Sequence, residues 1–153
     1  MFFSYVVARD YGFAPNPFNG LCTLATCKQD IRKQAMVNDW IFGCGAASLN
    51  CKGKLIYAMK VTNKISYNDY FTDTKYSLKK PIMNGSLKRM YGDNIYFFDK
   101  NKGEWKQLDS HHSNEDGSIN HYNLRRDTKC EYLLLSDHFF FLRQKLYRNP
   151  RGI

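Results

Sequence analysis

The sequence lacks an apolar run of the roughly 20 residues that a membrane-spanning helix requires, so we expect a soluble protein with no membrane partner. It also lacks a CxxC pair, an internal repeat and a low-complexity tract. The five cysteines are an odd number, and their spacing matches neither a disulfide scaffold nor a structural zinc site. Because no signal peptide is recognisable, we expect free thiols in the reducing cytoplasm. The cysteines are Cys22, Cys27, Cys44, Cys51 and Cys130.

Acidic residues are scarce: 14 Asp and Glu stand against 23 Lys and Arg, which gives a formal net charge of +9. A basic domain attracts polyanions, nucleic acid above all, because neutralised phosphates release their counterions. Net charge also promotes solubility and carries no information about the fold. The expected partner is therefore DNA or a nucleotide, although charge alone does not decide between binding and mere solubility.

The length of 153 residues suits one domain, and a hydrophobic content of 43% is sufficient for a core. We expect a single domain over 1–153, ending in a basic, frayed tail at 143–153. Short apolar and aromatic segments outnumber helical ones, which predicts an α+β fold on a curled, mainly antiparallel sheet. Strands are expected at 1–8 (a central strand), at 40–43 and 54–62 (a hairpin), and at 95–98, 130–135 and 138–142. Helices are expected from about Thr26 to Met36 and at 67–71.

A polar segment at 109–118 (DSHHSNEDGS) contains the strongest candidates for chemistry. Two adjacent histidines reach one site only from a loop, because neighbours on a strand or helix point in different directions. Histidine changes charge near neutral pH, which suits acid-base catalysis, metal ligation or contact with a phosphodiester. The alternative is a polar loop whose histidines hold a turn. The spacing lacks a helical metal motif, so no metal is assigned, and no cofactor is indicated.

Two further groups are candidates for ligand binding. Arg9 and Asp10 leave an apolar segment and enter a Gly/Pro loop, where they either bind a ligand or only maintain the loop. Phe13 in that loop could stack on a base. Lys28 and Arg32 share one face of the expected helix, which either contacts phosphate or is merely solvated. Cys22 and Cys27 flank the start of this helix, where a thiolate would be stabilised, although buried, unreactive thiols are the favoured interpretation.

Several long motifs together resemble one known family. They run from Asp10-x-Gly-Phe-Ala-Pro through Gly20-x-x-Thr-Leu-Ala-x-Cys-Lys-x-x-Ile-Arg-x-x-Ala to Asp39-Trp-Ile-x-Gly. Further motifs are LIYAM at 55–59, NGS at 84–86, YGDN at 91–94 and DSHHS at 109–113. Together they resemble the nucleotide modification associated domain 2 family of bacteria and phages over nearly the whole chain. The strand and turn pattern at 39–61 is also similar, more weakly, to the small PUA-like β-barrel of PUA, ASCH and EVE domains.

The resemblance implies a nucleic-acid-associated domain that recognises or processes a modified DNA base in bacterial or phage base-modification or defence systems. As an enzyme, it would use His111 or His112 as general acid or base, oriented by Asp109 or Asp116. As a reader of modified bases, it would use the same groups to bind the base edge. The alternative is an enzyme that acts on free nucleotides through a His/Asp site. The expected ligand-binding residues are Arg9, Asp10, Phe13, Lys28, Arg32, Trp40, Ser110 and Ser113.

Overall fold

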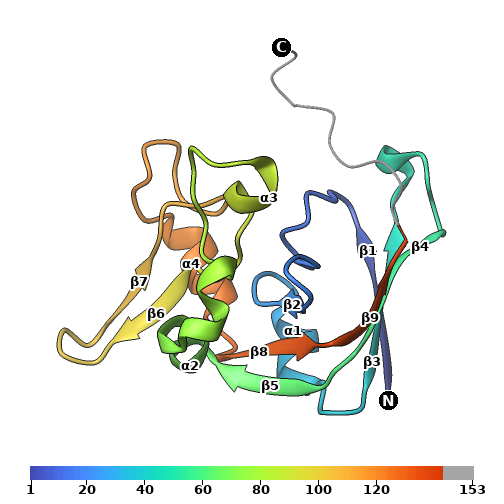
Figure 1. The fold of residues 1–153 in the computed structure, drawn as a ribbon, viewed down its shortest axis with the longest axis horizontal. Helices are drawn as coiled ribbons and strands as arrows, with labels where there is room; N and C mark the ends of the chain where they lie inside the picture. Colours follow the sequence, from blue (N-terminus) through green and yellow to red (C-terminus); the bar gives the residue numbers. More distant parts are fainter. Residues whose placement is uncertain (143–153) are drawn as a thin grey trace.

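The computed structural model describes residues 1–142, so the basic tail expected at 143–153 lies outside the described residues. Nine strands are found in this range, with four α-helices and two short 3-10 helices (Figure 1). The strands are β1 (Phe2–Val7), β2 (Cys22–Leu24), β3 (Trp40–Gly45), β4 (Leu55–Lys60), β5 (Asn63–Ser66), β6 (Tyr96–Asp99), β7 (Glu104–Gln107), β8 (Tyr132–Ser136) and β9 (His138–Phe141). The helices are α1 (Gln29–Gln34), η1 (Ala47–Leu49), α2 (Tyr67–Thr72), η2 (Thr74–Lys79), α3 (Leu87–Met90) and α4 (His121–Asp127).

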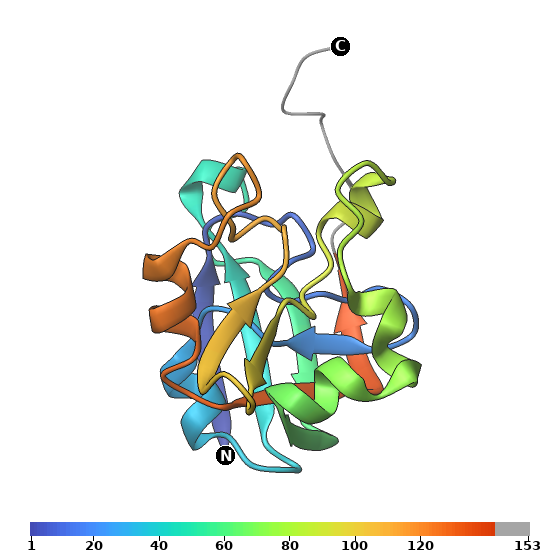
Figure 2. The ribbon, with the colours of Figure 1, turned by 90° about the vertical axis from the view of Figure 1, so that its left-hand side faces the viewer.

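The strands form three separate sheets, with orders β1-β3-β4-β9, β2-β8-β5 and β6-β7. Every pair is antiparallel except β1 with β3, so the expected α+β fold with mainly antiparallel sheets is confirmed. The sheets do not close into the PUA-like barrel that the strand pattern suggested. In Figure 2, the β6-β7 ribbon lies in front, with α4 on one side of it and α2 and α3 on the other. No helix among residues 1–142 is both long and apolar enough to cross a membrane.

Strand β1 is an edge strand, which corrects the expected central position. Its residues alternate between the protein interior and solvent: Val7 is buried, whereas Phe2 and Val6 are exposed. An apolar, aromatic sequence normally indicates a strand buried on both faces. Here the outward face of β1 is apolar although it is exposed. From sequence alone, such a strand looks the same as a strand that is buried on both faces.

The predicted β3-β4 hairpin and the short helix near 67–71 are confirmed, as are the strands near 95–98, 130–135 and 138–142. The predicted helix from Thr26 was too long: α1 begins only at Gln29 and ends at Gln34. The residues before it, 26–28, form a turn in which Cys27 and Lys28 adopt left-handed backbone conformations. This turn follows β2, whose three side chains are all buried and which pairs with β8, so the helix begins only after the turn.

The hydrophobic core consists of two clusters on opposite sides of β8. Leu134 packs into one cluster with Ile41 and Met59 of the four-stranded sheet. Leu133 and Leu135 point the other way, into the cluster that lies under α2, α4 and β6. Alternate side chains of a strand face opposite sides, so β8 joins both clusters, and each fully buried leucine contributes about 2 kcal/mol. The pairing of β2 with β8 fixes the position at which the turn after β2 begins.

A buried polar network fixes the loop between β1 and β2. The Lys79 ammonium donates to the backbone carbonyl of Leu21 at 2.6 Å and to the side-chain oxygen of Asn16 at 2.7 Å. Burial lowers the pKa of Lys79 to about 8, partly offset by the nearby carboxylate of Asp93. That carboxylate accepts a hydrogen bond from the Tyr70 hydroxyl at 2.8 Å. The loop is thereby held against the body of the protein, and its aromatic residues are placed beside the candidate site.

Candidate active site

Cys27 lies in a sharp turn between β2 and α1. Both Cys27 and the next residue, Lys28, adopt left-handed backbone conformations, with φ angles of 55° and 42°. Non-glycine residues rarely adopt this conformation, and it persists only where surrounding contacts enforce it. The turn projects the half-buried Cys27 side chain away from the β2 strand, whose own residues are enclosed in the core.

Two buried side chains hold the backbone of Cys27 on both sides. The carboxylate of Asp127 accepts a hydrogen bond from the Cys27 backbone N–H at 3.0 Å. The guanidinium of Arg32 donates to the Cys27 carbonyl at 2.7 Å and to the Asp127 carbonyl at 2.6 Å. Arg32 therefore connects the cysteine turn to the end of α4, where Asp127 is the last helical residue.

His112 comes from the polar loop after β7 and is buried at the same place. Its backbone carbonyl accepts a hydrogen bond from the Asn123 side chain of α4 at 2.9 Å. The ring of Phe13 packs edge-on against the imidazole, with ring centres 4.6 Å apart. The loop is thus attached to α4 on one side and to the β1-β2 loop on the other, which fixes the position of the imidazole.

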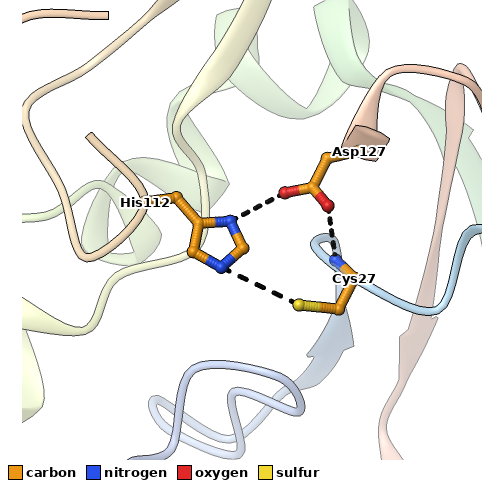
Figure 3. Close-up of side chains that lie close together, drawn as sticks. All are labelled: Cys27, His112 and Asp127. Carbon is orange, nitrogen blue, oxygen red and sulfur yellow. Dashed lines mark hydrogen bonds and ion pairs between the residues drawn. The ribbon is translucent and has the colours of Figure 1, made fainter. Parts of the chain in front are cut away.

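The imidazole of His112 lies between a carboxylate and a thiol (Figure 3). Its Nδ1 is 2.8 Å from Asp127 Oδ2, and its Nε2 is 3.8 Å from Cys27 Sγ. The order carboxylate, imidazole, sulfur is that of a catalytic triad: the carboxylate orients the imidazole, and the imidazole exchanges a proton with the nucleophile. The sulfur distance lies at the long end of the range for a hydrogen bond to sulfur.

The charges of the triad reinforce one another. Burial opposes protonation of His112, but the bond to Asp127 and the neighbouring Cys27 favour it, and together these effects raise its pKa to about 9. Burial also disfavours the Asp127 carboxylate, yet His112 and the nearby guanidinium groups keep the pKa of Asp127 below its usual value. The pair is therefore an imidazolium and a carboxylate at neutral pH.

Arg126 adds a second positive group beside the sulfur. Its Nη2 lies 3.8 Å from Cys27 Sγ, and its Nε lies 3.3 Å from Asp127 Oδ1. Cysteines that react as nucleophiles are found in partly exposed, electropositive surroundings of this kind. The sulfur of Cys27 is therefore flanked by an imidazolium and a guanidinium, with one side facing a cavity.

The cavity in front of Cys27 has a volume of about 410 Å³, which is within the usual size of a small-molecule site. Four cationic side chains line it, the His112 imidazolium among them, and none of its lining residues in the described range 1–142 is Asp or Glu. A cavity of this composition suits an anionic ligand. The cations are Arg9, Lys28, Arg126 and His112; aromatic walls come from Tyr5, Tyr11 and Phe13.

The same three residues contain metal-type donor atoms, which lie within 4.8 Å of one another in Cys27, His112 and Asp127. However, the imidazole contacts Asp127 through Nδ1 and Cys27 through Nε2, on different edges of the ring. An ion held by Nε2 and the sulfur would have Asp127 behind the imidazole as an outer partner. Two direct ligands are fewer than the three or four that zinc takes from proteins, so the arrangement fits a catalytic triad better.

The two adjacent histidines have different surroundings. His111 lies at the rim, among Tyr11, Phe13 and Tyr91, with ring centres 5.1 to 5.4 Å away. Partial burial of the imidazole against these rings, together with the charges of His112 and Arg9, lowers the pKa of His111 to about 4. His111 is therefore neutral at pH 7, whereas His112 is charged.

The carboxylate that orients His112 is that of Asp127, in place of the expected Asp109 or Asp116. Asp109 accepts a hydrogen bond from Ser113 Oγ at 3.0 Å. Asp116 accepts bonds from the backbone and hydroxyl of Ser118, at 3.0 and 2.6 Å, as turn-forming aspartates do. Both carboxylates thus serve the loop itself.

The two serines of the loop also form turns. The Ser113 hydroxyl accepts the backbone N–H of Ser110 at 3.0 Å, and its single proton is shared between the Asp109 carboxylate and the carbonyl of Ser110, which lies 2.8 Å away. Ser110, His111 and Ser113 border a second, larger cavity of about 920 Å³. This cavity is bounded on its other side by α3 and Tyr91, so His111 lines both cavities.

The other predicted ligand-binding residues fall into two groups. Arg9, Phe13 and Lys28 line the Cys27 cavity, whereas the buried Asp10 does not. Arg32 is fully buried and donates to backbone carbonyls, which corrects its expected place on a solvated helix face. Trp40 lies on β3, on the face of the sheet away from the cavity.

Comparison with family models shows that residues 1–151 match nucleotide modification associated domain 2. The chain belongs to this family. The nucleotide modification associated domain 2 match covers the cysteine turn, the histidine loop and α4, so the candidate site lies entirely inside the family's domain. No curated protein and no solved structure matches the chain.

In this member of the nucleotide modification associated domain 2 family, the sequence indicated His112 but not its partners. Cys27 was considered at a helix start and interpreted as an unreactive thiol, since no local feature revealed a base beside it. Asp127 and Arg126 were missed because helix α4 was not anticipated. Asn120 accepting the Asn123 N–H at 3.0 Å is the cap that could have indicated where this helix begins.

Proposed function

We propose that this protein is a thiol-dependent enzyme of nucleotide modification, in which Cys27 attacks an electrophilic carbon of a modified base or nucleotide. The observation that carries the proposal is the alignment of Asp127, His112 and Cys27 in one hydrogen-bonded series beside a cavity. The family match supports a nucleotide context for that chemistry. Free thiols of this kind persist in a reducing cytoplasm, which is where we place the reaction.

The proposed reaction is acyl transfer or hydrolysis at an amide or ester carbon on the nucleotide. His112 carries the reacting proton on Nε2, and Cys27 attacks as the thiolate while the sulfur–carbon bond forms. The leaving nitrogen or oxygen takes that proton as its bond to carbon breaks, which leaves a thioester on Cys27 and a neutral imidazole. Water then attacks the thioester, giving a proton to His112 and releasing the acid and the Cys27 thiolate. Asp127 holds the imidazole orientation throughout.

The cavity composition supports a phosphate-bearing substrate. Arg9, Lys28 and Arg126 provide positive charge around the sulfur, while Tyr11 and the buried Phe13 provide aromatic walls for a base. We propose a modified base in DNA as the natural substrate, which must leave the duplex to reach the cavity. The alternative, an enzyme of free nucleotides, uses the same residues. DNA binding weakens steeply as salt rises, whereas binding of a mononucleotide changes little, so salt titration separates the two.

The proposal is tested by thiol reactivity on the intact protein. Iodoacetamide labelling at pH 7 should modify Cys27 at least about tenfold faster than Cys44 and Cys51, which are equally half-buried free thiols. p-Nitrophenyl acetate should acylate Cys27, with deacylation following, and Cys27→Ser should abolish both reactions. Thymidine monophosphate should slow the labelling of Cys27 and leave Cys44 unchanged.

A protein in which Cys27 reacts no faster than Cys44, and in which Cys27→Ser retains every measured activity, would contradict a catalytic thiol. The groups around Cys27 would then act in a reader of modified bases. In that case His112→Ala would weaken binding of modified DNA while no turnover is found with any substrate.

A further inference from the structure

One face of the four-stranded sheet is open and carries a continuous series of aromatic rings. In Figure 1 this sheet forms one side of the molecule, and α1 to α4 all lie on its inner side. The inner face contributes Val7, Ile41 and Met59 to the core. No helix or strand among residues 1–142 packs on the outer face.

The register of the strands places the outward side chains in two rows across the sheet. Directly paired residues lie on the same face, and β1 pairs with β3, β3 with β4, and β4 with β9. The first row is Phe2, Trp40, Lys60 and His138; the second is Ser4, Phe42, Ala58 and Phe140. We call Phe2, Trp40, Phe42, His138 and Phe140 the open aromatic face.

The rings of this face contact one another from one edge of the sheet to the other. Phe2 and Phe42 have ring centres 6.2 Å apart, and Trp40 stacks on Phe42 at 6.0 Å. His138 connects the series, at 5.5 Å from Trp40 and 6.0 Å from Phe140. Phe2 is 75% exposed and Phe140 is 56% exposed, so large apolar surfaces remain in contact with water. Such contiguous patches on a protein surface usually mark an interaction site.

The charge of these strands indicates the kind of partner. The segments 1–8, 40–60 and 138–142 contain no Asp or Glu, while Lys60 lies within the first row. The sequence continues after 142 with Arg143, Lys145, Arg148 and Arg151 and no acidic residue. Aromatic rings with interspersed positive charge on an open sheet bind single-stranded nucleic acid, because bases stack on rings and cations pair with phosphates.

We propose that the open aromatic face binds single-stranded nucleic acid by base stacking. The ligand class is a single strand because paired bases in a duplex do not present their faces to side chains. Tyr5, on the inner face of β1, lines the Cys27 cavity, so this surface and the candidate active site lie on opposite faces of one sheet. The binding proposal does not depend on the catalytic one.

The two tryptophans allow a direct test. Trp40 belongs to the open aromatic face, whereas Trp105 lies on β7 beside the second core cluster. In the variant Trp105→Phe, Trp40 is the only source of tryptophan fluorescence. Addition of a single-stranded oligothymidylate of about 20 nucleotides should quench this fluorescence saturably, and the affinity should fall as salt rises. The same oligonucleotide paired with oligoadenylate should bind at least about tenfold more weakly.

Replacement of the two most exposed rings, Phe2→Ser with Phe140→Ser, should weaken binding of the oligothymidylate by roughly tenfold or more, since each ring stacks on a base. Tyr132→Ser removes a ring that is 48% exposed on another sheet and serves as the matched control. Both variants should keep the melting temperature of the parent. Cys27→Ser should bind as the parent does, so failure of one proposal leaves the other intact.

Two results would overturn this proposal. The first is the absence of saturable quenching, or binding that is the same with and without Phe2 and Phe140. The second is a tryptophan emission that shifts to shorter wavelength as protein concentration rises, accompanied by dimer formation in sedimentation. That result would assign the face to a second copy of the chain.

Discussion

Asp127 accepts a hydrogen bond from the backbone N–H of Cys27 at 3.0 Å, across a separation of 100 residues in the chain. Its other carboxylate oxygen lies 2.8 Å from the imidazole of His112. One buried carboxylate therefore fixes both the position of the thiol and the orientation of the imidazole. The strained backbone of Cys27 is maintained by this contact and by the carbonyl bond from Arg32.

Replacement Asp127→Asn should lower the rate of Cys27 alkylation at pH 7 by about tenfold or more, because His112 loses its anionic partner. The free energy of unfolding should fall by roughly 1–3 kcal/mol, since the charged hydrogen bond to His112 is replaced by a neutral one. Alkylation kinetics and urea unfolding measure the two effects. Asp116→Asn is the matched control, because Asp116 bonds only within its own turn. If Cys27 is alkylated at the same rate in Asp127→Asn and Asp116→Asn, Asp127 is not the carboxylate that orients His112.

The stability of the protein should fall as pH rises through about 9. The pKa of His112 is raised to about 9 in the folded protein and is about 6.5 in an unfolded chain. The folded state binds the extra proton, so this stabilisation is complete below pH 6.5 and lost above pH 9; it amounts to at most about 3 kcal/mol. Urea unfolding of the parent and of His112→Gln between pH 6 and 10 tests it. If the free energy of unfolding of His112→Gln falls with pH as steeply as that of the parent, another group causes the pH dependence.

The adjacent histidines should behave differently when each is replaced by phenylalanine. His111→Phe should retain the fold and at least about half of the Cys27 alkylation rate, since a neutral ring among Tyr11, Phe13 and Tyr91 is replaced by another. His112→Phe should lower that rate by about tenfold or more because the imidazolium that stabilises the Cys27 thiolate is lost. Iodoacetamide kinetics with peptide mapping measure both rates. If His111→Phe lowers the alkylation rate of Cys27 and His112→Phe does not, His111 is the catalytic histidine.

Arg32→Met should strongly destabilise the protein. The guanidinium donates to four backbone carbonyls, and its loss removes that donor from buried and partly buried acceptors, at a cost of about 3–5 kcal/mol. The melting temperature should fall by roughly 10 °C, at about 3 °C per kcal/mol for a chain of this length. Lys33→Met on the exposed side of α1 is the control and should change little. The four carbonyls are those of Cys27, Asp127, Cys130 and Tyr132.

Local sequence patterns were sufficient to predict most of the longer strands, and the motifs were sufficient to indicate the nucleotide modification associated domain 2 family. Apolar alternation predicted the β3-β4 hairpin, because side chains of a strand alternate regardless of distant contacts. Two histidines in a polar loop predicted chemistry near 109–118, and His112 is indeed part of the candidate site. These features depend on residues that are neighbours in the chain.

Which groups act together depends on the packing of distant segments. Cys27 and His112 are separated by 85 residues, and the contact between them depends on how β8, α4 and two loops pack. Packing also enclosed Arg32, which helical spacing placed on an outward face of a helix, and left Trp40 on an open face of the sheet, although it was expected to bind the ligand. Periodicity determines that a strand has two faces, but burial depends on what the rest of the chain brings against each face.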